Sequence, residues 1–193
     1  MSRVRVRDIP GVRIMTERPQ HRSEVSILRL AKTLDEYVAE CGLQLDPGFQ
    51  RPYVWDQVRQ VRFIEYLLRG GDDVRARTIM LNAPNWDPRY VAGEYSAFTL
   101  VDGKQRLNAI RKFVANELIV FSDYRCSDLL FGSMDHTISI HVNHLRSERE
   151  VLQWYLDINE SGVAHSDEEL NRVRGMIAQI DAERGAALEG RTS

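Results

Sequence analysis

The sequence contains few cysteines and no long apolar run, and both shortages narrow the class of protein. Its 193 residues include only two cysteines, Cys41 and Cys126, which cannot form a disulfide framework and are expected to be reduced thiols. No stretch approaches the roughly 20 apolar residues that a membrane-spanning helix needs. The arginine-rich start, MSRVRVRDIP, lacks the apolar segment of a signal peptide. We therefore expect a cytoplasmic protein without a membrane partner.

Several familiar catalytic motifs are also missing from the sequence. It contains no Walker A loop, no GxGxxG fingerprint and no GxSxG elbow. His136, His141 and His144 are close in sequence, but along a strand His141 and His144 point to opposite faces. Without paired cysteines or an HExxH helix, a zinc site is not favoured. Neither cysteine lies near a candidate base, so a thiol nucleophile is not expected.

Charge is nearly balanced overall but uneven along the chain. The net charge of −2 predicts no partner by itself, whereas residues 1–32 contain eight basic and three acidic residues. Such an arm can contact a phosphate backbone, or it can be a solvated, flexible lead-in. The lack of aromatic residues among the arginines favours the second interpretation.

Composition and local patterns predict a globular domain of the α+β (mixed α/β) class. The chain is 43% hydrophobic and 28% charged, which is typical of globular proteins, and its length suits one domain. We expect an extended basic lead-in over 1–23, the domain over 24–184 and a frayed tail over 185–193. Short strands interspersed with helices predict a small sheet with flanking helices.

The expected elements follow from alternation, helical spacing and caps. Strands are predicted at 25–30, 78–82, 97–101, 118–121 and 137–142, with a brief strand at 43–45. Helices are predicted from a capping box at Thr33 to Gly42, from Asp56 to Gly70, with Val58, Val61, Ile64 and Leu68 inward, and from Lys104 to Ala115. Two more are expected to begin at Ser147 and Ser166. The long loop over 83–96 suggests a lid or a contact surface.

The most informative segment for function is the predicted junction between strand and helix at residues 101–106. Helix N-termini present unpaired N–H groups and a positive dipole end. Gly103 allows close approach of a ligand, and Lys104 and Arg106 add cationic donors. Asp102 could hold a metal or orient water. The structural alternative is an aspartate N-cap followed by an exposed first turn, but two basic residues there oppose the dipole.

Two further segments contain candidate binding groups. FQRPYVW at residues 49–55 places an amide, a guanidinium and two aromatic rings around Pro52, whose φ is fixed. Arginine suits phosphate, and Tyr53 or Trp55 could stack on a base. Alternatively, these aromatics form a hydrophobic plug against the next helix. Residues 156–163, which include Asn159, are expected to connect two helices.

In this order, the three segments resemble the N-terminal domain of GmrSD-type restriction endonucleases. The family pattern is an FQRpYvW turn, a DGQQR junction and a late N-t-G-G turn. Here Phe49–Trp55 matches almost completely, Asp102–Arg106 has Lys104 where glutamine is usual, and Asn159–Val163 matches loosely. The resemblance covers about residues 24–175. It implies a ParB/sulfiredoxin-like fold.

The resemblance also implies a function and a set of site residues. It implies nucleotide binding and hydrolysis coupled to restriction of DNA, often modified phage DNA, together with an HNH-type nuclease. We find no His-Asn-His constellation here, so we expect a module that acts without its own nuclease domain, with a nuclease subunit in trans. Expected catalytic residues are Asp102, Arg106 and Asn159; expected phosphate-binding residues are Gln50, Arg51, Gly103, Lys104 and Gln105.

The expected ligand is a nucleoside triphosphate with Mg²⁺. Asp102 would hold the metal or polarise the attacking water, Asn159 would complete the metal or phosphate shell, and Gln50 and Gln105 would orient phosphates or base edges. Lys104 keeps phosphate affinity plausible but changes the family's hydrolytic geometry. Two alternatives remain open: a DNA-binding module that needs no nucleotide, and a non-catalytic interaction protein that regulates a nuclease partner.

Overall fold

The chain folds into two compact units, one of which contains the sheet. The computed structural model describes residue 9 and residues 20–86, 95–132, 136–160 and 167–189. The larger unit spans Pro19–Glu148, and the smaller unit combines Met1–Arg18 with Arg149–Ser193. Both segments expected to form the strand–helix junction and the FQRPYVW turn lie in the larger unit.

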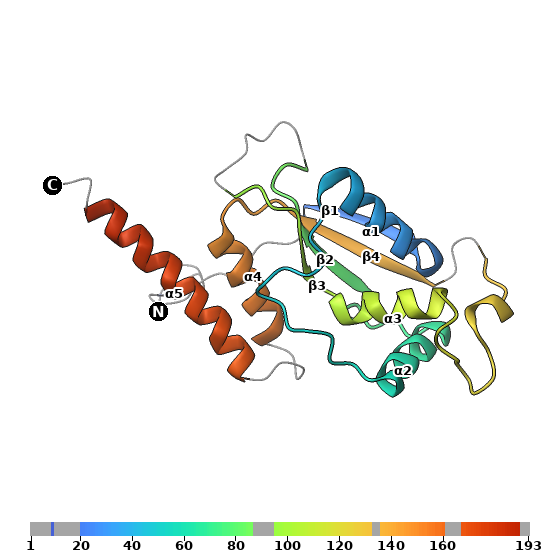
Figure 1. Ribbon diagram of the computed structural model, residues 1–193. Helices are drawn as coiled ribbons and strands as arrows, with labels where there is room; N and C mark the ends of the chain where they lie inside the picture. Colours follow the sequence, from blue (N-terminus) through green and yellow to red (C-terminus); the bar gives the residue numbers. More distant parts are fainter. Residues whose placement is uncertain (1–8, 10–19, 87–94, 133–135, 161–166, 190–193) are drawn as a thin grey trace, which may run out of the picture. The chain divides into compact units, whose positions relative to one another are not determined.

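A four-stranded mixed sheet forms the centre of the larger unit (Figure 1). Its strands are β1 (His21–Ser26), β2 (Thr78–Asn82), β3 (Thr99–Asp102) and β4 (Thr137–Asn143), in the order β1-β4-β2-β3. β4 pairs antiparallel with β1 and parallel with β2, whereas β3 pairs antiparallel with β2. β3 therefore ends the sheet on one side and leads directly into a helix.

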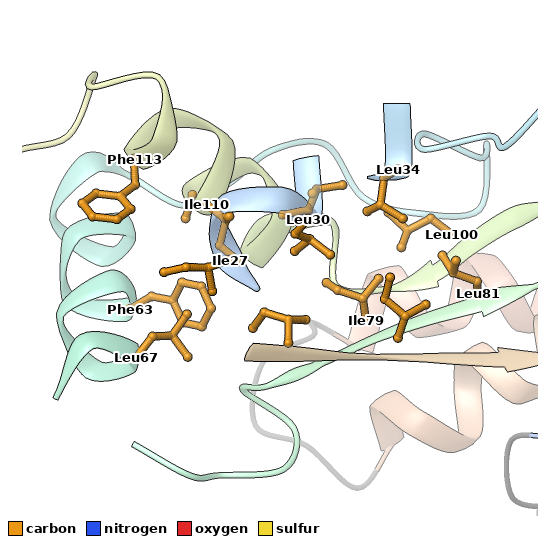
Figure 2. Packing of buried hydrophobic residues seen from close by; sticks show 14 of the residues in the cluster. Ile27, Leu30, Leu34, Phe63, Leu67, Ile79, Leu81, Leu100, Ile110 and Phe113 are labelled. Atoms are coloured by element: carbon orange, nitrogen blue, oxygen red, sulfur yellow. The ribbon is translucent and has the colours of Figure 1, made fainter. Parts of the chain in front are cut away.

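Three helices bury one face of this sheet. They are α1 (Ile27–Cys41), α2 (Gln57–Leu68) and α3 (Lys104–Val114). Strand side chains alternate between faces, so every second residue of β2 and β4, such as Ile79, Leu81 and Ile140, is apolar and lies in the core with the helices. Figure 2 shows their side chains gathered in a single core, which includes Ile27, Leu30, Leu34, Phe63, Leu67, Ile79, Leu81, Leu100, Ile110 and Phe113. Burying one such side chain contributes about 1.5–3 kcal/mol.

The other face of the sheet carries buried polar groups. Thr78, Asn82, Thr99, His141 and Asn143 are all less than one-tenth exposed. The Asn82 side chain donates to the carbonyl of Leu145 (3.1 Å) and accepts from its N–H (2.8 Å). Buried polar groups normally have such partners, so this amide fixes the chain that follows β4.

The smaller unit consists, in the residues described, mainly of two helices. These are α4 (Glu148–Glu160), whose first residue belongs to the larger unit, and α5 (Asp167–Glu189). Arg149 donates to both carboxylate oxygens of Asp181, at 2.6 and 3.0 Å. α5 begins with three acidic residues, Asp167–Glu169, which complement the positive end of its dipole. Among the described helices, none is long and apolar enough to cross a membrane.

The structure confirms the expected class, an α+β domain with a small sheet and flanking helices. The strands at 78–82 and 137–142 and the helix from Lys104 are also confirmed, and β3 lies close to its expected place. α4 opens one residue after Ser147, close to its expected start. α5 continues to Glu189, beyond residue 185, where we expected a frayed tail. Residues 87–94 of the long loop and Ser166 lie outside the described residues.

The strand expected at 25–30 and the helix start at Thr33 are wrong. β1 ends at Ser26, and α1 already begins at Ile27. Ile27, Leu30 and Leu34 lie on one helical face, and all three are fully buried. This core contact outweighs the local alternation that suggested a strand. Gly42 ends the helix as expected, with a φ of 69°.

Two shorter expected strands are reduced to single bridges. Gln44 forms one parallel bridge to Thr99, so the 43–45 strand is only a contact along the outer side of β3. In place of a strand at 118–121, Val120 bridges Tyr124 around a tight turn. Phe121 and Ser122 have φ values of 50° and 71° in that turn, which a strand does not allow.

The buried face of α2 agrees only partly with the face predicted from the sequence. Asp56 caps the helix as expected and accepts from the Arg59 N–H at 2.7 Å. Val58, however, is 58% exposed, while Phe63 and Leu67 are buried. The buried face is therefore rotated from the predicted one, because α2 packs against α3.

Candidate functional site

The strand–helix junction has a backbone geometry that requires glycine. Gly103 follows the last residue of β3 directly, precedes the first residue of α3 and has a φ of 111°. A Cβ at this position would lie 2.3 Å from Cδ1 of Ile79 and 3.3 Å from its Cα. Gly103 thus brings the start of α3 close to β2, and it provides no side-chain cap to the first turn.

An ion pair lies beside this glycine. The Arg106 guanidinium donates through Nη2 to Asp102 Oδ2 (2.5 Å) and to the Thr78 carbonyl (2.9 Å). The same Nη2 is 3.5 Å from the place that a Cβ on Gly103 would occupy. The Arg106 and Asp102 side chains remain 16% and 24% exposed. A cation and a carboxylate therefore flank the glycine at the N-terminus of α3.

Lys104 is turned toward the FQRPYVW segment. Its side chain is 5% exposed, and its ammonium is paired with the Asp46 carboxylate. It also donates to the Arg51 carbonyl (2.8 Å) and lies 4.9 Å from the centroid of the Tyr53 ring. An ammonium over an aromatic face is attracted by the ring quadrupole. Lys104 consequently connects α3 with residues 46–53.

Two glutamine amides complete this connection. Gln105 accepts from the N–H groups of Val54 (3.0 Å) and Trp55 (3.3 Å) and donates to the Pro52 carbonyl (2.8 Å). Gln50 donates to the Leu100 carbonyl of β3 at 2.5 Å. Both glutamines are 8% exposed. The segment over 50–55 is therefore fixed along the end of β3 and the first turn of α3 by directed hydrogen bonds.

The two aromatic residues expected to stack on a base differ in exposure. Tyr53 is 50% exposed, so part of its ring is open to a ligand. Trp55 is partly buried and packs edge-on against Phe63, with centroids 5.4 Å apart. Arg59 lies over its ring at 5.2 Å. Tyr53 thus suits base stacking better, whereas Trp55 also fits the alternative of a plug against α2.

The structure brings most of the predicted site residues together. The contacts described above join the Gln50–Trp55 segment to Lys104, Gln105 and the Leu100 carbonyl, whereas Asp102 and Arg106 contact each other, and Arg106 also contacts the Thr78 carbonyl. Asn159 is instead on the last turn of α4, in the smaller unit, because the helix continues through Glu160. Its buried amide donates to the Tyr155 carbonyl at 2.7 Å. Its role in a metal or phosphate shell stays a prediction.

Three partners of these residues were not predicted from the sequence. Asp46 pairs with Lys104, the Thr78 carbonyl accepts from Arg106, and Gln60 donates to the Trp55 carbonyl (2.8 Å). A buried lysine needs an anionic or polar partner, which is a signal for some carboxylate nearby. The partner is 58 positions away in the chain, however, and spacing alone does not select Asp46.

The junction offers only a minimal donor set for a metal ion. In the part of the chain that the structure describes, no group of three or more His, Cys, Asp or Glu side chains could hold one. Magnesium in nucleotide sites is typically held by one or two carboxylates together with the phosphates. Asp102 fits such a site only when a nucleotide supplies the remaining oxygens.

A comparison with models of protein families finds a match for the larger part of the chain. The family described as GmrSD restriction endonuclease, N-terminal domain, matches residues 31–137, which is more than half of the chain. The chain belongs to this family. The matched range of the GmrSD N-terminal domain includes the Gln50–Trp55 segment and the junction but not Asn159. Membership indicates a component of a restriction- or defence-type system. No curated protein and no solved structure matches the chain.

Proposed function

We propose that the junction binds the phosphates of a nucleoside triphosphate, and that the chain is the nucleotide-binding and hydrolysing module of a restriction-type DNA-processing system. One observation carries the proposal: Gly103 provides no side-chain cap to the first N–H groups of α3, and the Arg106 guanidinium lies beside it. Helix N-termini bind anions through free N–H groups and the positive dipole end. Arginine adds charge-assisted hydrogen bonds to phosphate oxygens.

The neighbouring residues have roles that fit the same ligand. Asp102 would orient the attacking water, and it would be the carboxylate that holds Mg²⁺, whose charge neutralises phosphate oxygens. The exposed part of Tyr53 would stack on the base. Gln50 and Gln105, already bonded to backbone groups, would keep the 50–55 segment beside the phosphates.

A nucleotide screen tests the binding step. We expect one or more of ATP, GTP, CTP and UTP, with Mg²⁺, to raise the melting temperature; at 100 times Kd the stabilisation is about 2.7 kcal/mol. Arg106→Ala is expected to abolish the shift. Arg111→Ala is the matched control, since Arg111 is on the same helix but pairs with Asp35 of α1. Absence of a shift with every nucleotide would contradict the proposal.

Phosphate release tests the hydrolytic step separately. If Asp102 orients water, Asp102→Asn should still bind nucleotide but release phosphate at least about 100-fold more slowly, the usual contribution of general base catalysis. Release at the wild-type rate would remove Asp102 from the mechanism while leaving the binding site intact.

A DNA-binding module is the second candidate, and family membership favours it. In that case the cations of the junction would hold the DNA backbone, and a nuclease subunit would act in trans. Affinity for DNA would then fall steeply with salt and would need no nucleotide. A filter-binding titration at several salt concentrations, with and without nucleotide, distinguishes the two functions.

A further inference from the structure

Lys104 has an unusual position for a phosphate-binding lysine. Its side chain is 5% exposed although Asp46, its carboxylate partner, is 70% exposed. All of its polar contacts described above are with the segment over 46–53: the Asp46 carboxylate, the Arg51 carbonyl and the Tyr53 ring. The ammonium is thus enclosed by groups of its own chain.

The chemistry of the ammonium explains this arrangement. A buried cation is unfavourable unless it is paired and hydrogen-bonded, and an ammonium has three N–H donors. Two of these donors reach Asp46 and the Arg51 carbonyl, and the remaining charge faces the Tyr53 ring. Binding a phosphate through Lys104 would require it to leave these partners.

We infer that Lys104 is a positioning residue, which together with Asp46 holds Arg51 and Tyr53 beside the nucleotide, and that it does not itself bind phosphate. The inference rests on the proposed nucleotide site and refines it. Arg106 then supplies the phosphate contact, while the Lys104–Asp46 pair holds the Tyr53 ring in the position where it stacks on the base.

Phosphate binding and positioning by Lys104 predict opposite changes in nucleotide affinity for the substitution Asp46→Asn. If Lys104 bound phosphate, Asp46→Asn would free its ammonium and remove a negative charge, so nucleotide affinity would rise. If Lys104 positions the segment, the same substitution loosens Arg51 and Tyr53, so affinity falls. Losing one charge-assisted hydrogen bond predicts a fall of about tenfold.

Calorimetric titration of the full chain with the nucleotide found in the screen provides the measurement. We expect Asp46→Asn to bind about tenfold more weakly, and Asp46→Glu, which keeps the carboxylate, to recover most of that loss. Asp35→Asn is the matched control, because Asp35 is also an exposed carboxylate (61%) paired with a cation on α3. Its affinity should equal that of the wild type.

Two further readouts separate positioning from a general loss of structure. Hydrogen exchange at the amides of Val54 and Trp55 should become faster in Asp46→Asn and stay unchanged in Asp35→Asn. The loss of affinity should also be equal for the nucleoside monophosphate and triphosphate. An affinity that rises, or that changes for the triphosphate alone, would contradict this positioning role and would overturn the inference.

The possible outcomes keep the two proposals apart. A wild-type chain that binds no nucleotide overturns the proposed function, and this inference with it. A wild-type chain that binds, with Asp46→Asn binding equally well or more tightly, overturns only the role of Lys104 and leaves the site at the junction in place.

Discussion

The helix-covered face of the sheet and the junction at the end of β3 are built in different ways. The first is apolar and interdigitated, with side chains from α1, α2, α3 and the strands in one cluster (Figure 2). The second has a glycine, two ion pairs and two buried amides that bond to backbone groups. Apolar burial is non-directional, whereas hydrogen bonds fix atoms within tenths of an ångström.

Because of this difference, we expect the apolar core to determine stability and the junction to determine nucleotide binding. Truncations in the apolar core should lower the free energy of unfolding strongly and leave nucleotide affinity intact as long as the chain is folded. Changes at the junction should have a smaller effect on stability and a larger effect on affinity.

Phe113→Ala should destabilise the protein most. Phe113 is fully buried, and truncating such a ring typically costs about 3–5 kcal/mol. Urea unfolding followed by circular dichroism measures the change. Val58→Ala, at a position 58% exposed, is the control and should remain within about 0.5 kcal/mol of the wild type. A small effect at Phe113 would show that the core on α3 is not packed as described.

Gly103→Ala should affect both stability and binding. Its φ of 111° and the Cα of Ile79, only 3.3 Å from the new Cβ, predict a loss of about 1–3 kcal/mol and no nucleotide binding. Gly42→Ala is the matched control, since Gly42 also has a positive φ but has nothing within 4 Å. It should lose some stability and still bind. Equal binding by both variants would contradict the role of Gly103.

Gln105→Leu should have a smaller effect on stability. The substitution removes the partner of two N–H groups and one carbonyl, but the segment is partly exposed and water can replace the amide, so we expect about 1 kcal/mol. Amide exchange at Val54 and Trp55 should accelerate, while α1 amides stay protected. Unchanged exchange at these two positions would show that Gln105 does not hold the segment.

The smallest expected effect is a loss of stability in mild acid. It comes from His141, on the face of the sheet that carries the buried polar groups. Burial lowers the pKa of His141 below its usual 6.5, and Arg22 lowers it further while Glu24 raises it. The unfolded chain therefore takes up a proton near pH 6.5 before the folded chain does, and the free energy of unfolding falls as the pH drops from there to the folded pKa. Urea unfolding at several pH values should show a shallower decline for His141→Gln, and an identical decline would contradict this assignment.

Much of the fold and half of the junction could be predicted because the sequence patterns that determine them extend over only a few neighbouring residues. Val101–Arg106 contains a buried strand end, a glycine and the start of an amphipathic helix, all readable over a few residues. The error at 25–30 has a local cause as well. Val25 and Ile27 alternate as in a strand, yet Ile27, Leu30 and Leu34 also follow helical spacing, and only the core decides between them.

The remaining part of the site depends on contacts distant in sequence. Lys104 and Arg106 were predicted to face a phosphate, but the sequence does not show that Lys104 turns toward Asp46 while Arg106 turns toward Thr78. Those choices follow from how residues 44–55 lie along β3, beginning with the Gln44–Thr99 bridge. The rotated face of α2 has the same origin in tertiary packing.

The most direct test of the account is a nitrogen–proton NMR titration of the labelled chain with the nucleotide and Mg²⁺. If the junction is the phosphate site, the backbone amides of Gly103–Arg106 should shift most, followed by those of Arg51 and Tyr53, and core amides such as Leu30 should stay in place. Shifts centred elsewhere, or none at saturating nucleotide, would contradict a phosphate site at the start of α3.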